Sequence, residues 1–161
     1  MAETDPIRPT DDEARALARA LLDGATSGAL GVLADGAPMV TRIAVARDEA
    51  GGPLTLVSAL SQHTTALRAQ PACSLMVGEP GDKGDPLTHP RLTLQCRADF
   101  VPRPGADHDR LRALYLRQQP KAKLYIDFGD FALVRLRMTA GFLNGGFGRA
   151  SRLAPEDLGL A

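Results

Sequence analysis

The chain of 161 residues contains no tryptophan, and aromatic residues make up only 4% of it. Few side chains can therefore stack on a flat ring or on the bases of single-stranded nucleic acid. Basic and acidic side chains are equal in number, 19 each, so the formal net charge is zero. A protein that binds the phosphate backbone of nucleic acid needs an excess of basic residues. The composition thus disfavours a nucleic-acid partner.

Cysteine is also scarce, since Cys73 and Cys96 are the only two in the chain. No Cys-x-x-Cys or Cys/His ligand spacing is present, so we expect no metal site. Disulfides are rare in the cytoplasm, and both cysteines lie in apolar runs; we therefore expect buried, reduced thiols. No Ser/His/Asp or Cys/His order points to a hydrolase.

Long apolar runs are missing as well. No stretch is long enough to span a bilayer, and residues 1–5 are acidic rather than the basic start of a signal peptide. We therefore expect a cytoplasmic protein with no membrane partner. The apolar and charged contents, 44% and 24%, are ordinary for a globular protein. We expect a flexible N-terminal arm over residues 1–9 and a single domain over residues 10–161.

The remaining patterns predict three helices and many short strands. Residues 10–13, Thr-Asp-Asp-Glu, form a capping box before a helical apolar pattern that ends at Gly24. Asp35-Gly36 lies between two apolar runs and predicts a hairpin. Short strands joined by tight turns favour a mainly β, α+β fold, an antiparallel barrel of six or seven strands with peripheral helices. The other helices are expected over 63–70 and 107–118, and the other strands over 29–33, 39–47, 54–57, 73–77, 91–101 and 131–143.

The most informative segment is a strand that runs directly into a cluster of hydroxyl groups and one imidazole. The members of this cluster are Ser58, Ser61, Gln62, His63 and Thr64. Backbone N–H groups at a helix start, with Ser and Thr hydroxyls beside them, form an anion site. Arg42, inside the strand over 39–47, supplies a planar cation that fits a phosphate. The pattern predicts a site for a phosphate-bearing cofactor.

The order of these segments resembles the FMN-binding split barrels of the pyridoxamine 5′-phosphate oxidase-like superfamily. Within it, the chain is most similar to the haem-utilisation and haem-degrading branch. The resemblance covers roughly residues 10–153 and implies a homodimer of six-stranded split barrels, with two FMN sites at the interface. It rests on the strand with Arg42, the strand and turn over 54–64, the loop over 84–92 and the Gly-Gly-Phe-Gly-Arg-Ala turn over 145–150.

The resemblance also implies roles for individual residues. Arg42 would hold the FMN phosphate together with the hydroxyl and imidazole cluster, and Arg91 would approach the polar edge of the isoalloxazine ring. The turn with Gly146 and Arg149 would come from the other subunit. The run from Arg149 to Ser151 lacks the histidine with which the vitamin-converting oxidases contact their substrate. Genuine pyridoxamine phosphate oxidase activity is therefore not expected.

Two functions are consistent with these observations. The first is an FMN-dependent oxidoreductase acting on a small molecule, with the redox chemistry supplied by the cofactor. The second is a non-enzymatic module that carries FMN as a sensor or store, or binds haem at the dimer cleft. A structural protein without a cofactor is less favoured, because the cationic groups would then lack partners. F420 or haem in place of FMN, the substrate and the catalytic residues stay open, and His89 and His108 are expected in solvent.

Overall fold

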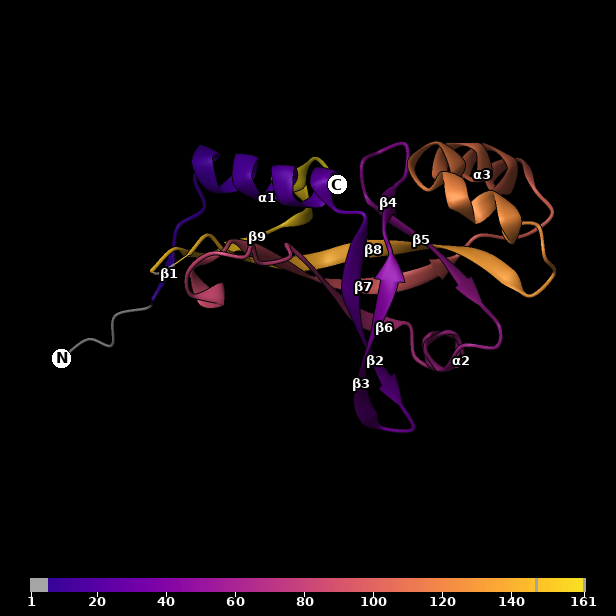
Figure 1. Cartoon of the computed structure of the whole chain (residues 1–161). Helices are drawn as coiled ribbons and strands as arrows, with labels where there is room; N and C mark the ends of the chain where they lie inside the picture. Colours follow the sequence, from indigo (N-terminus) through magenta and orange to yellow (C-terminus); the bar gives the residue numbers. More distant parts are fainter. Residues whose placement is uncertain (1–5, 147, 161) are drawn as a thin grey trace.

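A computed structural model of the chain describes residues 6–146 and 148–160 (Figure 1). No helix in this described part is both long enough and apolar enough to cross a bilayer. The helices are α1 (Asp12–Gly24), α2 (Gln62–Ala69) and α3 (Ala106–Gln118), with 3₁₀ turns η1 (Pro86–Thr88), η2 (Pro120–Leu124) and η3 (Pro155–Leu158). The strands are β1 (Ile7–Arg8), β2 (Ser27–Ala34), β3 (Ala37–Ala44), β4 (Ala46–Arg47), β5 (Pro53–Ser58), β6 (Ala72–Val77), β7 (Arg91–Phe100), β8 (Phe131–Asn144) and β9 (Ala150–Leu153).

The strands form a single sheet in the order β1-β9-β8-β7-β6-β2-β3, with β5 paired to β8 and β4 paired to β5. The expected α+β split barrel with peripheral helices is confirmed. The strand count exceeds six or seven because β1 and β4 have two residues each and β9 has four. Figure 1 shows α1 and α3 on the same side of the sheet, toward opposite ends, and the β2–β3 hairpin projecting away from them.

β1 lies within the segment expected as a flexible arm. Ile7 and Arg8 pair in parallel with Ala150 and Ser151 of β9, while the ladders between the other strands are antiparallel. Residues 1–5 of the arm lie outside the described residues. β1 thus ties the start of the described chain to its last strand.

The sheet is split between β3 and β5. In the described residues no ladder joins these two strands, and only the short β4 pairs with β5 on this side. Thr55 bridges the seam, because its fully buried hydroxyl donates to the Ala44 carbonyl at 2.7 Å. The bond gives a buried polar group its partner and holds the two strands together where backbone pairing is interrupted.

Local sequence signals locate the turns and helix ends to within a residue. β2 and β3 are joined by Asp35 and Gly36, both with positive φ (50° and 79°), as a type I′ hairpin turn requires. α1 starts one residue later than the expected capping box, because Asp11 rather than Thr10 accepts the first-turn N–H, at 2.8 Å. The Thr10 hydroxyl donates instead to the Arg152 carbonyl of β9.

Two apolar cores hold the helices to the sheet. The larger lies between α1, α2 and the inner face of the sheet, and the smaller joins α3 and η2 to β4, β5 and β8. His108 was expected in solvent, but it is buried. The reason is its helical spacing with Leu111 and Tyr115, which places it on the face of α3 that packs against the sheet.

The ladder between β2 and β6 is short and tightly packed. It pairs residues 29–31 with residues 74–76. At Gly28, beside this ladder, an added Cβ would meet Leu75 Cδ1 at 2.7 Å and the Met76 carbonyl oxygen at 2.9 Å. At Gly31 the nearest atom would be 3.8 Å away. The close approach of the two strands therefore requires a glycine at position 28 and not at position 31.

We expect Gly28→Ala to lower the free energy of unfolding by about 1–3 kcal/mol, because the new methyl group overpacks a buried contact with backbone. Gly31→Ala is the matched control in the same strand and should be neutral or slightly stabilising. Urea unfolding of both variants measures the difference. Equal unfolding midpoints for the two variants would show that β2 and β6 are not held this closely.

Candidate functional site

The hydroxyl cluster at the end of β5 is partly used by the turn itself. The Ser58 hydroxyl donates to the Asp130 carboxylate at 2.9 Å, and the buried Thr64 hydroxyl donates to the Ser58 carbonyl at 2.5 Å. Ser61 precedes the first residue of α2, but its side chain makes no capping hydrogen bond. The start of α2 therefore leaves the side chains of Ser61 and the exposed Gln62 available to a ligand.

His63 lies in the first turn of α2 and is half-buried. Its Nδ1 is 3.0 Å from the hydroxyl oxygen of Thr41 in β3, whereas Nε2 has no hydrogen bond within the described chain. Burial opposes a positive charge and lowers the pKa of His63 below its ordinary value of 6.5. At neutral pH the ring is uncharged, and Nε2 is the nitrogen left for a ligand.

Arg42 lies on the other face of β3. Successive side chains of a strand point to opposite faces, so Thr41 turns toward His63 and Arg42 turns away. Arg42 is exposed on the outer side of the sheet. Within one chain the structure therefore does not bring Arg42 and His63 to a common phosphate position, because the alternation of the strand separates them.

Arg91, Gly146 and Arg149 gather at the far end of β7 and β8. The Arg91 guanidinium donates to the carbonyls of Leu87, at 2.9 Å, and His89, at 3.3 Å. The backbone of Gly146 approaches the same loop, since a Cβ there would meet the Thr88 carbonyl oxygen at 3.0 Å. Arg149 is exposed, with its guanidinium 3.9 Å from the Glu13 carboxylate.

The loop over residues 78–90 is held in place by hydrogen bonds of His89. His89 Nδ1 accepts a hydrogen bond from the Gly81 N–H at 3.1 Å, and Nε2 lies 2.7 Å from the Lys83 carbonyl, to which it donates in this tautomer. His89 is thus a structural contact of the loop and not the solvated side chain that the sequence suggested. Its two ring nitrogens are both engaged.

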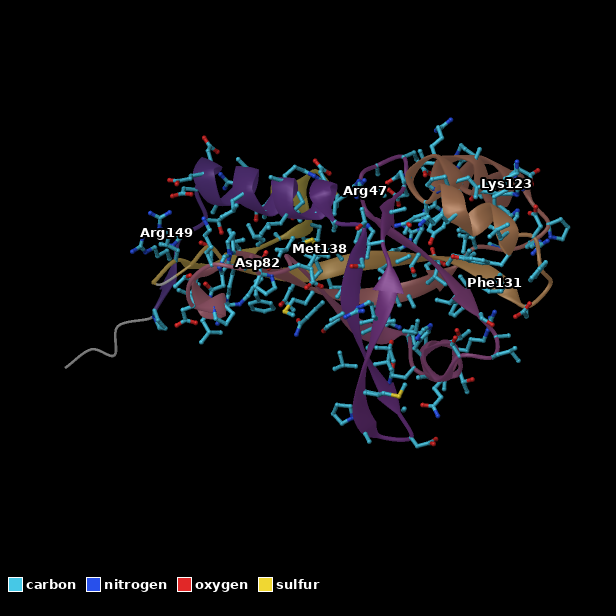
Figure 2. All side chains as sticks on the ribbon, viewed as in Figure 1. Arg47, Asp82, Lys123, Phe131, Met138 and Arg149 are labelled. Atoms are coloured by element: carbon cyan, nitrogen blue, oxygen red, sulfur yellow. The ribbon has the colours of Figure 1, made fainter. Side chains whose placement is uncertain are left out.

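The expected site residues fall into two groups at opposite ends of the molecule. Figure 2 labels Phe131, which pairs with Ser58, and Arg149 near opposite ends of the chain's longest strands. β7 runs between the two groups, and its 10 residues span about 30 Å at the usual rise of a strand. Within one chain, Ser58, Ser61 and His63 therefore cannot share a small ligand with Arg91 and Arg149.

A row of side chains on the exposed outer face of the sheet was not predicted from the sequence. Residues paired across six neighbouring strands form this row, which has an arginine at each end and apolar or small side chains between them. Met76 and Phe142, near its middle, are 44% and 38% exposed. Alternation within each strand could have indicated the outward positions, but not their register. The row consists of Arg42, Ala29, Met76, Thr93, Phe142 and Arg152.

A family model, CREG β-barrel, matches residues 9–158. The chain belongs to the CREG β-barrel family. A curated relative from Arabidopsis thaliana, the chloroplastic non-canonical haem oxygenase HOZ, is 33% identical over 121 residues. The match covers 73% of this chain and 36% of the relative, so this CREG-family chain spans about a third of that protein's length.

Solved structures agree with the family assignment. A haem-binding protein from Mycobacterium smegmatis superposes with a TM-score of 0.82 at 27% identity, over 95% of this chain and 61% of its own. A Clostridium acetobutylicum protein of the pyridoxinephosphate oxidase family has a TM-score of 0.70 at 12% identity, over 92% and 99% of the two chains, and supports the fold alone. The resemblance to the split-barrel superfamily, with the haem-utilisation branch closest, is confirmed.

We expect the pKa of His63 in the free protein to lie below 6.5. The folded state then binds fewer protons at this ring than the unfolded state, so His63 lowers stability as the pH falls through 6.5 and has no such effect above it. Proton NMR titration of the ring measures the pKa directly. The control is His63→Asn, which should flatten the pH dependence of unfolding between about pH 7 and pH 5. A measured pKa above 6.5 in the free chain would contradict the buried placement.

Proposed function

We propose that this chain binds haem, as a homodimer, on the outer face of its sheet. The observation that carries the proposal is the row from Arg42 to Arg152, in which apolar and small side chains lie between two cationic ends. A porphyrin combines a flat apolar ring with two carboxylates on one edge, so the apolar middle of the row suits the ring and an arginine beside it suits the carboxylates. Two relatives at 33% and 27% identity, a haem oxygenase and a haem-binding protein, support this choice of cofactor.

The residues present fit such a group. Met76 and Phe142 offer apolar contact to a ring, and the guanidinium groups of Arg42 and Arg152 have no ion pair within the described chain. Among the histidines, His63 has a ring nitrogen available, but its contact with Thr41 places it on the face of β3 opposite Arg42, so within one chain it does not reach a ring on the outer face. Bound haem would supply iron redox chemistry, and the chain would supply binding, orientation and electrostatics.

A homodimer is part of the proposal because a single chain leaves the expected site residues apart. The two groups of expected site residues lie about 30 Å apart along β7, so a second copy is needed to bring one group close to the other. The outer face also exposes Val40, Met76 and Phe142, apolar side chains that the ring and a partner would cover together. A two-fold arrangement uses the same patch on both copies, as most homodimers do.

We expect Met76→Glu to convert the dimer into a monomer, because it places a charge in the middle of the covered face. Leu124→Glu is the matched control, since Leu124 is 80% exposed on η2, away from this face. Light scattering after size-exclusion chromatography gives the masses. A monomeric wild type at micromolar concentration, or dissociation by both variants, would refute the proposed interface.

FMN is the second candidate, with the chain then acting as a flavin-dependent oxidoreductase or an FMN carrier. The observation that favours it is the start of α2. There, first-turn N–H groups lie beside His63 and beside the Ser61 hydroxyl, which makes no capping hydrogen bond. The Asp130 carboxylate, 2.9 Å from the Ser58 hydroxyl, opposes an anion at this position. Arg42, on the other face of β3, also gives no support within one chain.

Titration of the purified chain with haem and with FMN, followed by absorbance and flavin fluorescence, separates the candidates. We expect a shifted Soret band and saturable haem uptake. Ser61→Asp sharpens the test, because aspartate is a good helix cap but its charge repels a phosphate at the start of α2. Haem uptake should be unchanged in this variant. FMN uptake by the wild type that disappears in Ser61→Asp would establish the flavin function instead.

A further inference from the structure

A cleft opens in the outer face where β2 and β6 separate. The two strands pair only through residues 29–31 and 74–76, and beyond this ladder the β2–β3 hairpin diverges from β6 and β7. The cleft has a volume of about 490 Å³. This volume is within the range of small-molecule sites in proteins.

The walls of the cleft are mostly apolar. Leu33 and Val40, on the hairpin side, are 42% and 71% exposed in the free chain, and Pro38 and Met39 also line this side. On the other side are Ala72, Ser74 and Gln95, with the buried Cys73 and Cys96 behind them in the core; both cysteines are free of disulfides, as the sequence suggested. Burial raises the pKa of Cys73 to about 11, so this thiol is uncharged at neutral pH. The lining therefore favours an apolar ligand.

Arg97 is the one charged side chain that lines the cleft among the described residues. It lies opposite Arg137 in the β7–β8 ladder, and like charges in this position repel each other. Asp99, the nearby acid, is engaged by Arg137 at 2.7 Å. The Arg97 guanidinium has no hydrogen bond or ion pair to any residue that the structure describes. An exposed guanidinium at the wall of an apolar cleft, facing a second cation, is suited to an anion brought by the ligand.

We propose that this cleft binds the edge of the porphyrin and that Arg97 pairs with one of its propionate carboxylates. The inference rests on the proposed haem function. It adds where on the outer face of the sheet the ring binds and which residue orients it. A carboxylate placed there forms a bidentate ion pair with the Arg97 guanidinium, which has no acidic partner of its own among the described residues. The apolar part of the ring covers Leu33 and Val40.

The test compares two arginines that face each other. Arg97→Ala should weaken haem binding about tenfold, as the loss of a charge-assisted contact does, and Arg137→Ala should change it less than about twofold because its charge is already neutralised. Both variants are titrated, as the full chain, with haem and with haem dimethyl ester, in which the propionates carry no charge. With the ester, Arg97→Ala should bind as tightly as the wild type.

Each other outcome overturns the proposal in a recognisable way. Equal loss in Arg97→Ala and Arg137→Ala would assign the effect to the general charge of the face. A tenfold loss that persists with the ester would mean that Arg97 acts through packing rather than through a carboxylate. In both cases haem still binds the wild type and the proposed function stands. A wild type that takes up neither porphyrin overturns the proposed function and this inference together.

Discussion

The arrangement of the outer face depends on the ladder between β2 and β6. Three residue pairs join the β2–β3 hairpin to the rest of the sheet on this side, and they do so only because Gly28 lets the strands approach closely. Where this ladder ends, the hairpin diverges and the cleft begins. A longer ladder would close the cleft, and a looser one would leave the hairpin without support from β6. The divergence of the hairpin and the place for a ligand are therefore consequences of the same short contact.

Although the net charge is zero, the acidic partners of the arginines are distributed unevenly over the molecule. Around α3 the arginines are paired with acids: Arg135 contacts Asp48 and Glu49, and Arg112 contacts Asp127 in a bidentate pair. Arg42, Arg97 and Arg152 on the outer face have no such partners in the described structure. The acids thus neutralise several arginines near α3 and leave these three arginines of the outer face without an acidic partner. Composition alone suggested only that a nucleic-acid surface was absent.

Much of the fold could be predicted because its signals are local. The Asp35-Gly36 turn, the strand at 91–101 and the helix at 107–118 follow from turn chemistry and from the spacing of apolar residues over a few positions. The cap of α1 was misplaced by one residue because Thr10 has a distant competitor, the Arg152 carbonyl. The burial of His108 also follows local spacing, although no local pattern indicates which segments cover that face of α3.

The site was harder to predict because it depends on contacts between distant segments. Ser58 and Asp130 are 72 residues apart in the sequence, yet the carboxylate takes the hydroxyl that was expected to contact a phosphate. Arg42 and His63 are close in sequence, but strand alternation puts them on different faces. The row from Arg42 to Arg152 and the pairing of Arg97 with Arg137 depend on register across six strands. No short sequence motif specifies that register.

The loop over residues 78–90 would normally be the most variable part of such a face, but it is internally bonded along much of its length. The His89 ring, the Asp85 carboxylate, the Thr88 hydroxyl and the Arg91 guanidinium all bond to backbone groups within or beside the loop. Its conformational entropy is therefore largely lost during folding. A molecule that binds to this loop does not require the loop to become ordered first. The association rate at this end of the sheet is therefore set by collision and orientation.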